Sequence, residues 1–301
     1  MRLGVNLPNF GAGTTPDILR RWAETVEGLG FDLLMVSDHL ALTEDVDAIY
    51  PAPFYEPFSV LAWLAGVTSR IRLGTTVLLL PYRHPLQVAR MVGNIDALGG
   101  GGRLVLGVGS GWARGEFAAL GLPFERRGAM TEDHLTALRT LLANDIASHE
   151  GPFVNFRNVR TAPRPAEGSV PIWVGGNSDV ALRRAIRLGD GWHPLRFGSM
   201  SWLRAALVRA QRFAEELDRP VPALAPRIPL RPTDSPVTDV DRPVGTGTIE
   251  QIRADLDELR ELGADTVVLD TTNTDDPDNL RRPNTAWRIL ATVAEAHLNG
   301  G

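Results

Sequence analysis

Short apolar runs alternate with amphipathic segments along almost the whole chain. The apolar runs predict buried parallel strands, which read as continuous hydrophobic segments. The intervening segments carry apolar residues at helical spacing. The predicted strands are residues 3–7, 33–36, 72–80, 104–108, 172–174, 190–193, 223–230 and 266–269. The predicted helices are residues 16–29, 57–68, 85–98, 116–121 with 129–144, 178–188, 199–217, 249–262 and 285–298.

Eight strands, each followed by helical pattern, within 301 residues predict a single (β/α)₈ TIM-barrel domain over residues 1–301. The alternative is a doubly wound open sheet. It is disfavoured because the turn Asn9–Gly13 lacks the third glycine of a dinucleotide fingerprint. At the first helix, Thr15 is the expected N-cap, Pro16 the first helical residue and Gly30 the end.

Two segments interrupt the alternation. Residues 146–169 predict an insertion between the fourth and fifth strands, with a hairpin around Gly151–Phe156. The proline-rich residues 231–247 predict a loop, which we expect to be mobile.

Composition narrows the classes of function. The chain has 44% hydrophobic and 22% charged residues, an ordinary globular balance, and no apolar run long enough to cross a membrane. With no cysteine, disulfides and thiolate nucleophiles are excluded, and we expect a cytoplasmic protein without a signal peptide. A net charge of −5 without a long basic run argues against nucleic-acid binding.

The pair Asp38-His39 follows the second predicted strand directly. In a barrel the carboxyl ends of the strands form the active-site face, and an imidazole exchanges protons near neutral pH. The pair is therefore a candidate for acid/base catalysis, the ordinary alternative being a loop-capping acid beside a hydrogen-bonded histidine. Other polar or small residues at strand ends are Asn6, Thr75-Thr76, Ser110-Gly111-Trp112, Gly175-Gly176-Asn177 and Trp192-His193.

Two glycine-rich turns, Gly107–Gly111 and Val174–Ser178, follow neighbouring strands. Glycine allows backbone N–H groups to approach an anion, and the helix that Ser178 begins favours negative charge at its N-terminus. The turns predict binding of a phosphate or a flat ring, unless they are only tight turns. Trp112 either lines a planar ligand or packs, whereas Trp173 is expected in the core.

A metal site is not expected. Asp38, His39, His84 and His193 could all face inward, but no two share metal-ligand spacing on a helix. The side chains of Asp38 and His39 diverge because adjacent residues of an extended chain point to opposite sides.

Four segments in order carry a family resemblance: GFDLLMVSDHL, IRLGTTVLLLPYRHP, LGVGSGWARGEFAALGLPFERRGAMTED and VPIWVGGNSDVALRRAIRLGDGWHP. Together they resemble the bacterial-luciferase-like family, and within it the oxidoreductases that depend on the deazaflavin coenzyme F420. The resemblance is dense over residues 1–195 and looser over 245–298. FMN is the alternative cofactor that the family implies.

The resemblance implies a barrel that binds one flavin-type cofactor non-covalently at its C-terminal face. His39 would be the acid/base, and Asp38 would contact the polar edge of the ring or orient His39. Thr76 and Val77 would form a ridge under the ring, with a cis peptide bond between them. The remaining cofactor-binding residues would be Asn6, Gly107, Gly109, Ser110, Gly111, Trp112, Gly175, Gly176, Asn177, Ser178 and Trp192.

The expected function is hydride transfer between F420 and a small organic substrate. The rivals are an FMN-dependent monooxygenase supplied by a separate reductase, and a non-catalytic flavin-binding barrel. Sugar oxidation is not expected, because Trp112 and Ala41–Thr43 stand where sugar-oxidising relatives have a glutamate and a tryptophan. Glu116 is near in sequence but matches that glutamate poorly. The resemblance also implies a homodimer, and leaves the substrate and the direction of reaction open.

Overall fold

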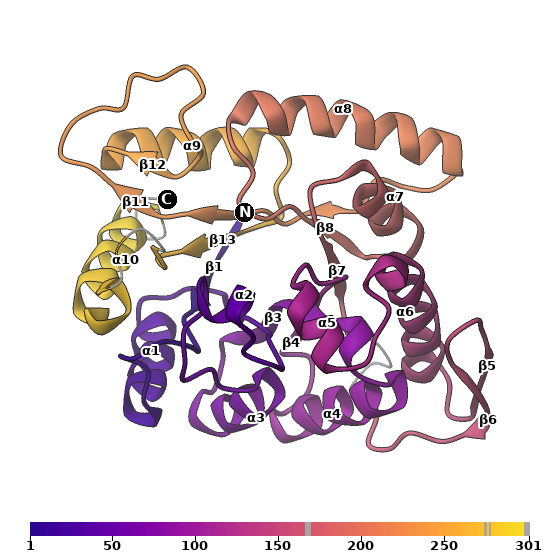
Figure 1. The fold of residues 1–301 in the computed structure, drawn as a ribbon. Helices are drawn as coiled ribbons and strands as arrows, with labels where there is room; N and C mark the ends of the chain where they lie inside the picture. Colours follow the sequence, from indigo (N-terminus) through magenta and orange to yellow (C-terminus); the bar gives the residue numbers. More distant parts are fainter. Residues whose placement is uncertain (166–169, 274–275, 277, 298–301) are drawn as a thin grey trace.

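The computed structural model describes residues 1–165, 170–273, 276 and 278–297. A curled sheet of nine parallel strands lies at the centre, and the long helices surround it (Figure 1). The strand order is β10-β13-β1-β2-β3-β4-β7-β8-β9. The strands are β1 (Arg2–Leu7), β2 (Leu33–Val36), β3 (Arg72–Leu79), β4 (Leu104–Gly109), β7 (Ile172–Gly175), β8 (Gly191–His193), β9 (Ala223–Leu224), β10 (Arg227–Pro229) and β13 (Thr266–Asp270).

The helices follow the predicted ranges closely. They are α1 (Pro16–Gly28), α3 (Pro57–Val67), α4 (Pro85–Leu98), α5 (Arg114–Ala119), α6 (Arg127–Ala143), α7 (Asp179–Leu188), α8 (Met200–Leu217), α9 (Ile249–Glu261) and α10 (Pro283–His297). The last predicted helical residue, 298, lies outside the described residues. At α1 the hydroxyl of Thr15 accepts the N–H of Ile18, so the predicted N-cap is confirmed. The short helix α2 (Glu44–Asp47) was not predicted, because four residues cannot display a helical period.

The two ends of the strand order belong to one stretch of chain. β9 and β10 flank Ala225-Pro226, where the predicted seventh strand is divided. The N–H of Ala225 donates to Trp192 O of β8 over 2.9 Å, and Val268 N of β13 donates to Pro226 O over 2.8 Å. Residues 223–229 therefore hydrogen-bond to β8 on one side and to β13 on the other.

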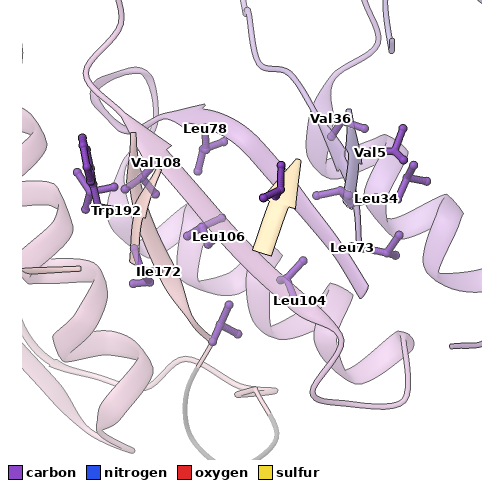
Figure 2. Close-up of a cluster of buried hydrophobic side chains, with 14 of the residues drawn as sticks. Val5, Leu34, Val36, Leu73, Leu78, Leu104, Leu106, Val108, Ile172 and Trp192 are labelled. Atoms are coloured by element: carbon purple, nitrogen blue, oxygen red, sulfur yellow. The ribbon is translucent and has the colours of Figure 1, made fainter. Parts of the chain in front are cut away.

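Apolar side chains fill both faces of the curled sheet. Leu34 and Val36 of β2 belong to the large core between the sheet and the helices, with Leu73, Leu104 and Ile172 of neighbouring strands (Figure 2). The alternate residues Leu33 and Met35 belong to a second cluster on the inner face, with Val105, Trp173 and Val268. This alternation is what a strand buried on both faces requires.

The segment between α6 and β7 forms the expected hairpin, with β5 (Ala147–Glu150) antiparallel to β6 (Asn155–Val159). Asp133 of α6 holds it, since its carboxylate accepts Phe153 N and Val154 N over 2.9 Å each and contacts His149 Nε2 at 2.8 Å. The end of the predicted insertion, residues 166–169, lies outside the described residues.

The loop 231–247 begins and ends in a short parallel pair, β11 (Arg231–Pro232) with β12 (Thr246–Gly247). Arg242 in the loop pairs with Asp255 of α9, and both backbone groups of Val237 bond the side chain of Gln251. The mobility expected of this loop stays a prediction.

None of the helices in the described part of the chain combines the length and apolar character needed to span a bilayer.

Candidate active site

His39 follows β2 and is held by a carboxylate far away in sequence. Its Nδ1 lies 2.9 Å from Oε2 of Glu116 on α5, 77 residues along the chain. The same carboxylate accepts the N–H groups of Leu40 and Ala41 and the hydroxyl of Tyr82. Glu116 is fully buried and His39 is 7% exposed. Burial alone would raise the pKa of Glu116, but the His39 contact and the two backbone donors lower it below its ordinary value.

Asp38 turns away from His39 and pairs with Arg83. The two carboxylate oxygens accept from the guanidinium over 2.7 and 2.9 Å, and Oδ2 also accepts Leu79 N over 2.8 Å. Both groups are buried, and Arg83 reaches Glu56 at 3.2 Å as well. Asp38 therefore anchors the end of β3 to the end of β2, which agrees with the alternative of a loop-capping acid.

The end of β3 carries an irregularity under the site. The peptide bond between Thr76 and Val77 is cis, as expected, and the pairing of β3 with β4 shifts register between Thr75 and Leu78. The side chain of Val77 lies between two glycines, since a Cβ at Gly109 or at Gly175 would come within 2.6 or 2.8 Å of its methyl groups. Because neither glycine has a side chain, the Val77 side chain of the Thr76-Val77 ridge fits between them.

A buried polar network lies behind Thr76. Its hydroxyl contacts Nε2 of His193 at 2.9 Å and a guanidinium nitrogen of Arg227 at 3.2 Å. Burial lowers the pKa of His193 to about 4, so the ring is neutral and its Nδ1 donates to Ala225 O. The hydroxyl of Thr76 must then donate to Nε2 and accept from Arg227. Arg227 also pairs with Asp270 at 2.6 Å.

A cavity opens above these groups, which we call the His39 cavity. Its lining includes Asp38, His39, Thr76, Val77, Trp112 and Arg227. Aromatic rings surround the imidazole, with Tyr50 at 4.9 Å, Phe54 at 5.6 Å and Trp112 at 5.7 Å between centroids. The indole of Trp112 is 43% exposed, so it borders the opening instead of packing in the core.

A second hollow, called here the Arg184 cavity, lies next to the first, since Gly111 of its lining precedes Trp112 of the other and Gly175 of its lining packs against Val77. Its lining includes Ser110, Gly111, Arg127, Gly176, Ser178 and Arg184. Gly111 and Gly176 have φ of +78° and +127°, which is backbone that favours glycine. Ser178 is the N-cap of α7 and accepts Ala181 N over 3.2 Å. The hollow thus meets a helix N-terminus, two hydroxyl groups and two guanidinium groups.

Arg184 is the buried cation of this hollow. Its side chain is 5% exposed, and burial lowers its pKa. Its contacts to Ser110 Oγ and Gly128 O are long, at 3.4 Å each, and Nε has no hydrogen-bond partner although Glu132 lies at 3.5 Å. A buried guanidinium that is this weakly satisfied is suited to bind an anion.

Ten of the fifteen predicted site residues line the two cavities: Asp38, His39, Thr76, Val77, Ser110, Gly111, Trp112, Gly175, Gly176 and Ser178. The other five, Asn6, Gly107, Gly109, Asn177 and Trp192, are absent from the lining of both cavities.

The structure places each of these five beside the site. Asn6 donates to Asp270 over 3.1 Å, and Gly107 leaves room for Thr75 O. Gly109 faces Val77, as described above. Asn177 exchanges two hydrogen bonds with the backbone of Leu195. Trp192 is 2% exposed, contacts Trp202 and donates to Gly176 O. Their predicted contact with a cofactor stays a prediction.

Sequence reasoning missed Tyr50, Tyr82, Arg83, Arg184 and Arg227, and it left Glu116 aside. Nothing local marks them, because each meets its partner only in the folded chain.

No group of three or more side chains that could hold a metal ion occurs in the described residues. His84, one of the four residues considered for a metal, accepts Leu86 N as the N-cap of α4.

The model of one known family, described as luciferase-like monooxygenase, matches residues 1–233. The chain belongs to that family. Among curated relatives, an uncharacterized protein of Mycobacterium tuberculosis is 32% identical over 212 residues, which cover 66% of this chain and 72% of the relative. An F420-dependent glucose-6-phosphate dehydrogenase of Intrasporangium calvum is 33% identical over 175 residues, covering 55% of this chain and 50% of that enzyme.

Solved structures agree with the fold. The monooxygenase RslO1 of Streptomyces bottropensis superposes with a TM-score of 0.78 at 21% identity and covers 99% of both chains. The oxygenating constituent of 3,6-diketocamphane monooxygenase of Pseudomonas putida, solved with FMN, gives 0.77 at 17% identity, covering 98% of this chain and 97% of that one. The proteins that this chain resembles thus include a relative named as F420-dependent and a structure of similar fold solved with FMN.

Proposed function

We propose that the protein is an oxidoreductase that transfers hydride between F420 and a small organic substrate, with His39 as the acid/base. The observation that carries the proposal is the pair of adjoining cavities. One contains a proton-exchanging imidazole beside the Thr76-Val77 ridge, and the other contains an underpaired buried guanidinium at a helix N-terminus. Such a pair suits a ligand with a reactive ring at one end and a phosphate along its tail.

We also propose that the fold is a (β/α)₈ barrel. We count residues 223–229 as one strand interrupted at Ala225-Pro226, since its two halves bond to β8 and β13. That count gives eight strands in a (β/α)₈ barrel. The hairpin β5-β6 then forms the insertion between the fourth and fifth barrel strands.

The residues present fit a flavin-type cofactor. A Cβ at Gly111 would come within 2.8 Å of the Phe117 ring, and one at Gly176 within 2.8 Å of Ala181 Cβ, and both residues have positive φ. Both turns therefore require glycine, which leaves their backbone open to the Arg184 cavity. Arg184, Ser110 and Ser178 would hold a phosphate, and Val77 would support the ring. When bound, the cofactor would accept or donate the hydride. His39 would exchange the accompanying proton, while the rings of Tyr50 and Trp112 restrict water at the opening.

F420 is preferred to FMN because of residue-level similarity. The F420-dependent relative is 33% identical over 175 residues, whereas the FMN-bound structure is 17% identical and supports only the fold. An FMN-dependent monooxygenase served by a separate reductase is the second candidate, and a non-catalytic flavin-binding barrel is the third.

Titration of the purified protein with F420 and, separately, with FMN tests the proposal. We expect F420 to bind at micromolar or lower concentration and the fluorescence of both the coenzyme and the tryptophans to change. Tight binding of FMN with no response to F420 would replace the proposal by the monooxygenase. Binding of F420 without any hydride transfer to a panel of ketones and enones, or from alcohols, would favour the non-catalytic barrel.

A further inference from the structure

The carboxylate of Glu116 is enclosed by hydrogen-bond donors. Oε1 accepts the N–H groups of Leu40 and Ala41, and Oε2 accepts the hydroxyl of Tyr82 at 3.0 Å and faces His39 Nδ1 at 2.9 Å. The residue is fully buried, so no water competes for these sites. Two backbone N–H groups occupy Oε1, the Tyr82 hydroxyl occupies Oε2, and the pKa of Glu116 lies below its ordinary value, so the group is an ionised carboxylate without a proton to donate. Both carboxylate oxygens of Glu116 therefore act only as hydrogen-bond acceptors.

This arrangement decides which nitrogen of His39 carries the proton. Because Oε2 can only accept, Nδ1 must donate to it. Tyr82 does not supply an alternative, since burial and the Glu116 charge raise the pKa of its phenol, which stays protonated and also donates. In neutral His39 the lone pair then lies on Nε2. No group among the described residues hydrogen-bonds Nε2, and the ring lines the His39 cavity.

We propose that Glu116 is a positioning residue that fixes His39 as the Nδ1–H tautomer and so presents Nε2 as its one proton-exchanging atom. This inference rests on the proposed function for its chemical use. For each hydride exchanged at a substrate carbon, one proton is exchanged at the substrate heteroatom. Nε2 takes that proton in oxidation and returns it in reduction, while the Nδ1–H bond to Glu116 persists. The histidine is then both oriented and, when protonated, balanced by the carboxylate.

Glu116 also fixes the loop after β2 through the N–H groups of Leu40 and Ala41, so lost activity alone could reflect a displaced loop. The substitution Glu116→Gln separates the two roles. Its amide oxygen is required at the Oε1 position by the two backbone donors, which leaves its NH₂ group facing Nδ1 of His39. The amide would then donate to Nδ1, and the proton of His39 would move to Nε2.

The test is nitrogen NMR of ¹⁵N-histidine-labelled protein without cofactor, with the His39 signals assigned by their loss in His39→Ala. We expect the Nδ1–H tautomer in the wild type and in Tyr82→Phe, which retains the carboxylate, and the Nε2–H tautomer in Glu116→Gln. The exposed Glu150 provides a matched control, since Glu150→Gln should leave the spectrum unchanged. An Nε2–H tautomer in the wild type would overturn the inference, even if the Gln variant failed to fold.

Turnover provides the second readout. In Glu116→Gln we expect kcat to fall about 10²–10⁴-fold while KM changes only a few-fold, because a misplaced proton removes acid/base catalysis and not binding. A switched tautomer with unchanged kcat would contradict the positioning role. If the wild type neither binds F420 nor turns over, the proposed function fails, whereas the NMR result still decides the tautomer.

Discussion

His39 combines a fixed orientation with an open ring nitrogen, and its loss should affect chemistry more than binding. Substitution His39→Ala is expected to reduce turnover about 10²–10⁴-fold, the usual contribution of a positioned acid or base. Cofactor affinity should stay within a few-fold, because the Arg184 cavity is unchanged. Steady-state kinetics and fluorescence titration of the same preparation check both parts. Near-normal turnover would remove His39 from the reaction.

Arg184 offers a separate test of the phosphate site at the residue scale. We expect Arg184→Gln to weaken cofactor binding by roughly tenfold or more, since a charge-assisted hydrogen bond contributes about 1.5–3 kcal/mol. The matched control is Arg183→Gln on the same helix, because Arg183 pairs with Glu216 and covers Phe213 outside the cavity. Equal affinities of the two variants would show that this hollow does not hold the phosphate.

At the scale of the elements, His193 links β8 to β3 through its hydrogen bond with Thr76. We expect the contribution of His193 to the free energy of unfolding to depend on pH. The ring is buried and neutral, with its pKa lowered from 6.5 to about 4. The unfolded chain therefore binds this proton first as the pH falls, so stability declines between about pH 6.5 and pH 4. The contribution is about 3 kcal/mol across that window, from 1.36 kcal/mol for each pKa unit.

Urea unfolding of the wild type and of His193→Gln, at several pH values in this window, measures the effect. The wild type should lose more stability on acidification than the variant, which lacks the titrating ring. Parallel pH dependences would contradict the assignment of a neutral buried His193.

Gln251 of α9 is one of the side chains that hold the loop 231–247. Gln251 completes the capping box with Thr248 and bonds both backbone groups of Val237. In Gln251→Ala we expect faster hydrogen exchange over residues 233–243, with exchange in β1 and β2 unchanged. Protection of the loop equal to that of the wild type would show that the Arg242–Asp255 pair suffices to hold it.

At the scale of the whole molecule, family resemblance leads us to propose a homodimer. Light scattering coupled to gel filtration should give about twice the 32.7 kDa of one chain. A mass of one chain across a hundredfold range of concentration would contradict the proposal. The same measurement after addition of F420 would show whether binding and assembly are coupled.

The sequence by itself determined the long helices, most strands of the sheet and the edge where the candidate site lies. The apolar run Leu33–Val36 predicts β2, and Asp38-His39 must follow it at the carboxyl end of a parallel strand. Local chemistry also placed Thr15 as an N-cap and Ser178 at the start of α7. These features need only neighbours along the chain, so spacing and residue type suffice to predict them.

Only the tertiary structure decided which partners each side chain meets. Glu116 reaches His39 across 77 residues, and Arg83 takes the carboxylate of Asp38 across 45. Trp192 could have faced a ligand from its strand end, but in the folded chain it belongs to the core between sheet and helices and contacts Trp202. Gly109 and Gly175 likewise have their reason in Val77, a residue of another strand. Such contacts depend on how strands and helices pack, which has no signature in local periodicity.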